Sequence, residues 1–339
     1  MFVAVGAAES GCRVVWEATG NEFFGYGQNC AGNVISALHA YPFVVGARWT
    51  SNYFEKCSLT AMYAKSVEDF VCVGNVIRNG ITSSQNVASE GAIGYAPSYH
   101  AKAPRPRAVI TNNIVDSPGG EPGSMQNGIS VIGSKESPAG KVVLTGNVLT
   151  DCGTGVRVVY AEDILIQDNV VSGGTVKAPA SGIRGDFLRN VVIRGNHIVV
   201  SGGHAIHLIR GLERARVAVE SNTVELPGKG FYGLICAEAA VLNVVSNRFY
   251  GSDAVSIRGA EGQRIGRLVW EGVNAITGRI SINYRMIDSV LGDPVGSGAP
   301  TGTVVAGAAG VRYTDMTAKA GGTCWISSAK GSNSWVKLA

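Results

Sequence analysis

Three of the five histidines lie within eleven positions, in the stretch NVVIRGNHIVVSGGHAIHLIRG that runs from Asn190 to Gly211. They are His197, His204 and His207, and closely spaced imidazoles are common ligands of zinc. A zinc site also needs a third protein ligand, and no other His or Cys lies close to them in the sequence. We therefore predict neither a metal site nor a bound cofactor.

Charged side chains recur in phase with His207. Four-residue segments that open with a small residue recur along the chain, and their third position is Arg157, Arg184 or His207 in three of them. Two positions further on, two of the segments are followed by a charged residue, Asp186 after Arg184 and Arg258 after Ser256. Guanidinium groups bind carboxylates as planar, bidentate donors. The pattern favours an anionic ligand such as an acidic sugar chain, provided that the fold brings these segments side by side.

The segments belong to a repeat of roughly 25 residues, a period typical of stacked repeat proteins. Each copy has an anchor residue, usually Asn, with an apolar residue three positions before it and another two positions after it. The anchors are Asn52, Asn75, Asn113, Asn147, Asn169, Asn196, Asn222, Asn247 and, as a degenerate last copy, Glu271. The flanking runs are β-branched and alternate with a period of two, which predicts strand, turn and strand.

The second set of strands carries the charged residues, and each is expected to bury its second position and expose its third. These segments are GISV from 128, GVRV from 155, GIRG from 182, AIHL from 205, GLIC from 233 and AVSI from 254. About three strands per turn and no helical segment predict an all-β chain, folded as a right-handed parallel β-helix. Asn suits its tight corner because it tolerates the left-handed conformation, and stacked Asn side chains should form a ladder. Coils about 4.8 Å apart then place Arg157, Arg184 and His207 on three consecutive turns.

Composition agrees with this fold and excludes several functions. Glycine is frequent, at 46 of 339 residues, as frequent tight turns require. The formal net charge is only +4 and no run of Lys or Arg is present, so we predict no binding to nucleic acid. No apolar run approaches 18 residues and no signal peptide is recognisable, so we predict no membrane insertion. The seven cysteines form no CxxC pair and are expected to be mostly free thiols.

The repeat stops after Leu291. We predict a β-helix over residues 1–291, a linker rich in Pro, Gly and Ser over 292–302, and a small β module over 303–339 that serves trimerisation or receptor contact. In this module, Gly310-Val-Arg-Tyr-Thr-Asp315 is followed by Trp325 and by the run from Gly331 to Trp335. The ending resembles the short terminal module of many bacteriophage tailspike and tail-fibre proteins, and the coil resembles their pectate-lyase-like β-helices.

The resemblance implies a homotrimer that binds, and often cleaves, the polysaccharide of a bacterial surface. Capsule or lipopolysaccharide, other phage tail proteins and further copies of the chain are then its partners, and the virion tail is its location. One departure is that repeat-like material such as RVVWEATGNEFF already stands within residues 1–50, where tailspikes usually carry a virion-attachment domain.

Two cleavage chemistries fit the residues. Hydrolysis needs two carboxyl groups, which Asp186 and Glu238 supply two coils apart. Elimination needs a base, either His207 or Tyr160, and a cation such as Arg184 that stabilises an enolate-like intermediate. Arg157, Arg184 and Arg258 are the expected substrate-binding residues. The alternatives are a receptor-binding or structural tail protein without enzymatic activity, and a cellular lyase or epimerase acting on uronate polymers.

Overall fold

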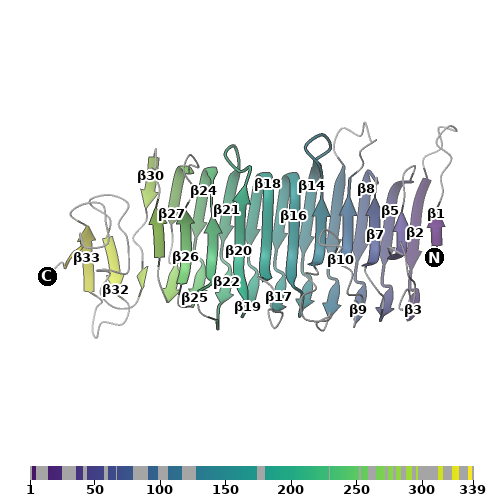
Figure 1. Ribbon diagram of the computed structural model, residues 1–339, viewed down its shortest axis with the longest axis horizontal. Helices are drawn as coiled ribbons and strands as arrows, with labels where there is room; N and C mark the ends of the chain where they lie inside the picture. Colours follow the sequence, from purple (N-terminus) through teal and green to yellow (C-terminus); the bar gives the residue numbers. More distant parts are fainter. Residues whose placement is uncertain are drawn as a thin grey trace.

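The computed structural model describes a stack of β-coils that covers most of the chain. Described are residues 2–4, 14–24, 36–40, 44–56, 60–65, 67–78, 91–97, 106–116, 127–173, 180–228, 230–251, 253–258, 265–271, 274–277, 280–283, 288–291, 295–296, 312–315, 323–327 and 335–337. Within them no helix has the length and apolar character that crossing a membrane requires. The coils succeed one another along the long axis of the molecule, from the N-terminus at one end to the C-terminal strands at the other (Figure 1).

Each coil contributes strands to three parallel faces, as the period-two alternation predicts. Face 1 contains β2 (Val14–Thr19), β5 (Val44–Thr50), β8 (Asp69–Val73), β11 (Arg107–Thr111), β14 (Ala139–Thr145), the second halves of β16 (Thr154–Gln167) and β18 (Ala180–Arg194), β21 (Arg216–Glu220), β24 (Ala239–Val245), β27 (Ile265–Glu271) and β30 (Asp288–Leu291).

Face 2 is built from short strands that follow the asparagine anchors. It contains β3 (Glu22–Phe24), β6 (Tyr53–Glu55), β9 (Val76–Arg78), β12 (Ile114–Asp116), β15 (Val148–Thr150), β17 (Val170–Gly173), β19 (His197–Val200), β22 (Thr223–Glu225), β25 (Arg248–Tyr250), β28 (Ala275–Thr277) and β31 (Val295–Gly296).

Face 3 carries the charged segments. It contains β1 (Phe2–Ala4), β4 (Ser36–Ala40), β7 (Thr60–Lys65), β10 (Gly91–Ala96), β13 (Asn127–Ile132), the first halves of β16 and β18, β20 (Gly203–Arg210), β23 (Tyr232–Cys236), β26 (Asp253–Arg258) and β29 (Ile280–Asn283). The predicted parallel β-helix is therefore confirmed, with three strands per turn.

An asparagine ladder runs along the corner between face 1 and face 2. In each step the backbone N–H and the side-chain Nδ2 of one Asn both donate to Oδ1 of the next, at 2.8 to 3.2 Å. The ladder joins Asn21, Asn52, Asn75, Asn113, Asn147, Asn169, Asn196, Asn222, Asn247 and Asn274. Nδ2 also donates to a carbonyl of the preceding coil, so each amide links three coils. The predicted ladder is thus confirmed.

Two details of the corner correct the prediction. Glu271 is not the last anchor, because it pairs with Val245 and an additional residue carries the chain on to Asn274. The left-handed backbone is also not at the anchors but at the residue before each anchor from Asn52 to Asn247, such as Asp168 before Asn169, with φ of 53°. That residue makes the turn, which leaves the anchor side chain pointing inward, where its amide can reach both neighbouring coils.

The predicted core positions are buried. The apolar residue three before each anchor from Asn52 to Asn247 is buried, and so is the residue two after it. Near the N-terminus the core is aromatic, with Trp49 packed edge-on against Trp16 and Phe70 at ring distances of 5.2 and 5.1 Å. Cys72, Cys152 and Cys236 are buried free thiols, and burial raises the pKa of Cys152 and Cys236 to about 12.

The C-terminal strands continue the sheet of face 2. β31 lies within the segment predicted as a linker, and Val295 pairs with Ala275 on one side and with Thr314 on the other. β32 (Arg312–Asp315), β33 (Thr323–Ser327) and β34 (Trp335–Lys337) then form an antiparallel meander. Arg312–Asp315, which belong to the motif that suggested the resemblance, therefore form β32 beside β31. The division at residues 292–302 stays a prediction.

Candidate functional site

Face 3 brings the three predicted cationic and imidazole groups into one column. The strand register pairs Arg157 with Arg184 and Arg184 with His207, so they occupy the same position on three consecutive coils. Ser130 precedes them and Ile235 follows them in that column. The side chains of all three are half-buried, whereas Ser130, also expected to face outward, is only 1% exposed because its hydroxyl accepts a hydrogen bond from the Gly91 amide.

Asp186 lies beside this column, but it is buried rather than exposed. Its Oδ2 accepts a hydrogen bond from Nε of Arg184 at 3.2 Å, and the residue is 5% exposed. Its Oδ1 is buried with no hydrogen-bond partner among the described residues. Even repeat spacing would pair Asp186 with Ile209. A register shift after Gly185 pairs it with Arg210 instead. The carboxylate of Asp186 is therefore paired with the guanidinium of Arg184 and acts electrostatically on that of Arg157.

The electrostatics of the column follow from partial burial and like charge. Burial, with the neighbouring Arg184, lowers the pKa of Arg157, while Asp186 acts in the opposite direction. Burial, His204 and Arg184 lower the pKa of His207 to about 4, again opposed by Asp186. At neutral pH His207 is thus an uncharged imidazole one coil from the Arg184 guanidinium and two coils from that of Arg157. The like charges of the two guanidinium groups repel each other, and Asp186 compensates only one of them.

His204 adjoins His207 on the same strand, with ring centroids 4.9 Å apart. Its Nδ1 accepts a hydrogen bond from the Tyr232 amide at 3.1 Å, so in the neutral imidazole the proton is on Nε2. Its ring also contacts those of Phe231 and Tyr232. No group of three or more His, Cys, Asp or Glu among the described residues is placed to hold a metal ion.

His197 is exposed and far from this cluster in the coil. It lies on face 2 between Val170 and Thr223, as its place after the anchor predicts, and its Nε2 is 3.3 Å from Glu225 Oε1. The three histidines of the opening stretch therefore do not converge on one ion.

The two carboxyl groups proposed for hydrolysis have structural partners. Glu238 is 8% exposed, and its Oε1 accepts a hydrogen bond from the Leu212 amide at 3.0 Å, which satisfies a backbone group at the turn between coils. Asp186 is bound to Arg184. Both carboxyl groups are buried, where a glycosidic bond cannot reach them without rearrangement.

The remaining predicted residues lie apart from the column. Tyr160 stands at the corner after face 3 with φ of 49°, and its ring stacks on that of Phe187 one coil along, 4.3 Å away. Arg258 ends β26 opposite Asn283, and its side chain lies outside the described residues. From the sequence, His204 and His207 were considered as a pair only as zinc ligands. A spacing of three places two side chains on opposite faces of a regular strand, but Ala205 and Ile206 are both buried, and the two rings come together.

Comparison with known proteins supports the fold. A family model described as the right-handed beta helix region matches residues 100–264. The chain therefore contains a right-handed parallel β-helix domain, and this segment includes Arg157, Arg184 and His207. Neither the curated proteins nor the solved structures gave a match.

Proposed function

We propose that the chain binds an acidic polysaccharide of a bacterial surface along face 3. The observation that carries this proposal is the register of Arg157, Arg184 and His207 on three consecutive coils, with Asp186 as the neighbouring carboxylate. Two adjacent guanidinium groups and one carboxylate leave a net positive charge, which an anionic sugar neutralises. Parallel β-helix domains are common in proteins that act on polysaccharides, which supports the same reading.

Binding is tested by replacing one guanidinium at a time in the full chain. Arg184→Ala should weaken the binding of an acidic capsule polysaccharide by about 10- to 100-fold, because a hydrogen bond to a charged group contributes about 1.5–3 kcal/mol. Arg194→Ala is the matched control, since Arg194 is an exposed arginine of the same strand that lies on face 1 and donates to Gln167. Equal affinity of the Arg184→Ala variant and the unsubstituted chain would remove the arginine column as the binding site.

Cleavage of the bound chain by elimination is a second candidate. Arg184 would hold the uronate carboxylate, and the uncharged His207 would accept the C5 proton. The electron pair then forms the C4–C5 double bond as the glycosidic oxygen leaves C4 and takes a proton from water. Elimination is favoured over hydrolysis because Glu238 is committed to the Leu212 amide, and His207 over Tyr160 because only His207 adjoins Arg184.

One assay separates cleavage from binding alone. Chain shortening with the ultraviolet absorbance of an unsaturated uronate indicates a lyase, and His207→Gln should abolish both signals while binding persists. Shortening without that absorbance indicates a hydrolase. Binding without shortening indicates a receptor-binding protein without enzymatic activity.

A role in a phage tail is the part of the proposal that rests on the resemblance of residues 310–335. Attachment to a virion, other tail proteins as partners and a homotrimeric assembly come with it. The third candidate is a cellular lyase or epimerase of uronate polymers. It would use the same chemistry on face 3, but it would not account for the phage-like ending.

A further inference from the structure

Face 1 carries an unbroken apolar stripe on its outer side. The stripe takes one outward, half-buried residue from each of six consecutive coils: Val71, Val109, Val143, Leu165, Val192 and Ala218. It is bounded by Arg48 on the coil before and by Asn243 on the coil after. We call these six residues the valine stripe.

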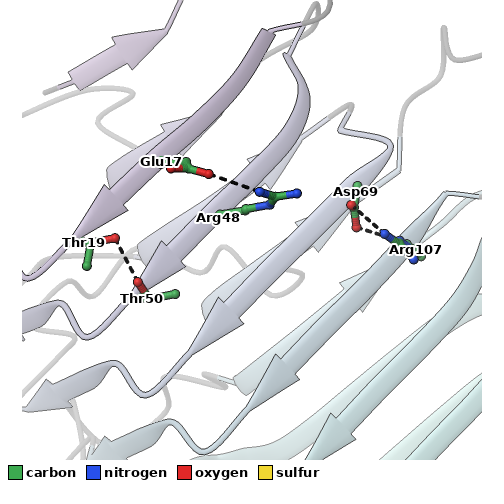
Figure 2. Close-up of polar contacts among 6 residues, drawn as sticks. All are labelled: Glu17, Thr19, Arg48, Thr50, Asp69 and Arg107. Carbon is green, nitrogen blue, oxygen red and sulfur yellow. Dashed lines mark hydrogen bonds and ion pairs between the residues drawn. The ribbon is translucent and has the colours of Figure 1, made fainter.

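Strand propensity alone does not account for the stripe. Thr has the same β-branched preference as Val, and it holds outward positions in the adjacent column of face 1, at Thr111 and Thr145. Leu165 has no such preference at all. The coils that precede the stripe use polar pairs instead, with Glu17 bound to Arg48 and Thr19 bound to Thr50 (Figure 2).

The column on the other side of the stripe is charged and has a definite order. Along the coils it reads Asp69, Arg107, Lys141, Asp163, Asn190 and Arg216. Asp69 already pairs with Arg107 at 2.8 Å (Figure 2), and Asn190 donates to Asp163 at 2.7 Å.

We infer that a second copy of this chain covers the valine stripe, with its coil axis antiparallel. A twofold axis along the strand direction, placed between the coils of Val143 and Leu165, is the one antiparallel arrangement that overlaps all six apolar residues. It places Val143 of each copy against Leu165 of the other, and the charged columns then meet in reverse order.

The reversed order is complementary in charge. Lys141 meets Asp163 and Asp69 meets Arg216, each twice by symmetry, and no like charges face each other in this column. In a pair with parallel coil axes, the charged column of each copy would face the column of Thr111 and Thr145 of the other. The one pair of opposite charges in that arrangement is Arg216 against Glu220. Charge complementarity therefore selects the antiparallel pair, which is a closed, isologous arrangement.

The area is sufficient for a stable pair. Eight coils from β5 to β24, four on each side of the twofold axis and about 4.8 Å apart, have strands of about five residues at 3.3 Å each and give roughly 600 Å² of face per copy. Pairing then buries about 1,200 Å² in total, within the range of specific interfaces. The inference does not depend on polysaccharide binding, because face 3 lies on another side of the coil. It is an alternative to the homotrimer that the resemblance implies, and the mass of the chain in solution distinguishes the two assemblies.

The test is the mass of the full chain in solution, measured by analytical ultracentrifugation. We expect two chains for the unsubstituted protein, and one chain for Val143→Asp/Leu165→Asp, with the dissociation constant raised at least about 100-fold. The matched control is Val148→Asp/Val170→Asp, which changes exposed valines of the same two coils on face 2 and should leave two chains.

A charge-paired variant tests the orientation. In Val143→Lys/Leu165→Asp each new lysine faces a new aspartate only if the axes are antiparallel, so this variant should again form a pair. Circular dichroism confirms that each variant keeps its strands. The inference is overturned by a single chain or three chains for the unsubstituted protein, by pairing that survives the two aspartates, or by dissociation of the charge-paired variant.

Discussion

Replacing one asparagine in the middle of the ladder tests whether side-chain amides hold adjacent coils together. Asn169 is a suitable position, because it lies in the middle of the ladder and its buried side chain bonds to both neighbouring anchors. Its Oδ1 accepts from both N and Nδ2 of Asn147, and its Nδ2 donates to Asn196 Oδ1 and to the carbonyls of Leu144 and Gln167.

The expected cost of Asn169→Ala is about 3–5 kcal/mol in the free energy of unfolding. About half of it comes from the buried N–H of Asn147, since an orphaned buried donor costs about 1–3 kcal/mol, and the rest from bonds lost to Asn196 and Leu144 at about 1 kcal/mol each. Asn169→Asp should cost at least as much, because it keeps the acceptor but places a charge where Nδ2 donated.

Denaturant unfolding measures this cost, and hydrogen exchange shows where the structure opens. The amide of Asn147 should lose protection together with its neighbouring coils. Asn190→Ala is the control, because its exposed side chain makes a single hydrogen bond to Asp163, and it should change stability by less than about 1 kcal/mol. A cost for Asn169→Ala as small as that of the control would refute the view that the ladder stabilises the stack.

Two further predictions concern the titration of His207 and the glycine turns at Gly211 and Gly20. The pKa of His207 is lowered to about 4 from an unfolded value near 6.5, so its contribution to stability is full above pH 6.5 and is lost as the pH falls to about 4. After allowance for solvent screening of a half-buried group, His207→Gln should remove about 2 kcal/mol of the acid-induced loss measured by denaturant unfolding. Equal pH profiles of this variant and the unsubstituted chain would refute the prediction. Gly211→Ala should destabilise the chain by about 2–3 kcal/mol and Gly20→Ala by about 1 kcal/mol, because both have positive φ but only at Gly211 would a Cβ meet a ring. Thermal unfolding of the two variants compares them directly, and equal shifts would contradict the steric argument.

The sequence carried most of the fold because a solenoid repeats its local rules. Val171 and Ile198 each follow an anchor by two positions. The period of two places both side chains in the core, and this holds regardless of the neighbouring coils. Regular spacing also predicted the column of Arg157, Arg184 and His207. The prediction failed where one residue was added, at Asp186 and before Asn274, because a single insertion shifts the register and no local pattern marks it.

The sequence alone determined which positions face inward. Apolar side chains at a fixed period are buried on one side of a strand, and this pattern can be read without knowing which distant residues they contact. The tertiary structure decided the state of each polar group. Whether Glu238 is a free acid or the acceptor for the Leu212 amide depends on which backbone donor the next coil presents, and the pKa of His207 depends on how much water the folded coils exclude. Both are properties of packing between coils, which spacing along one chain does not encode.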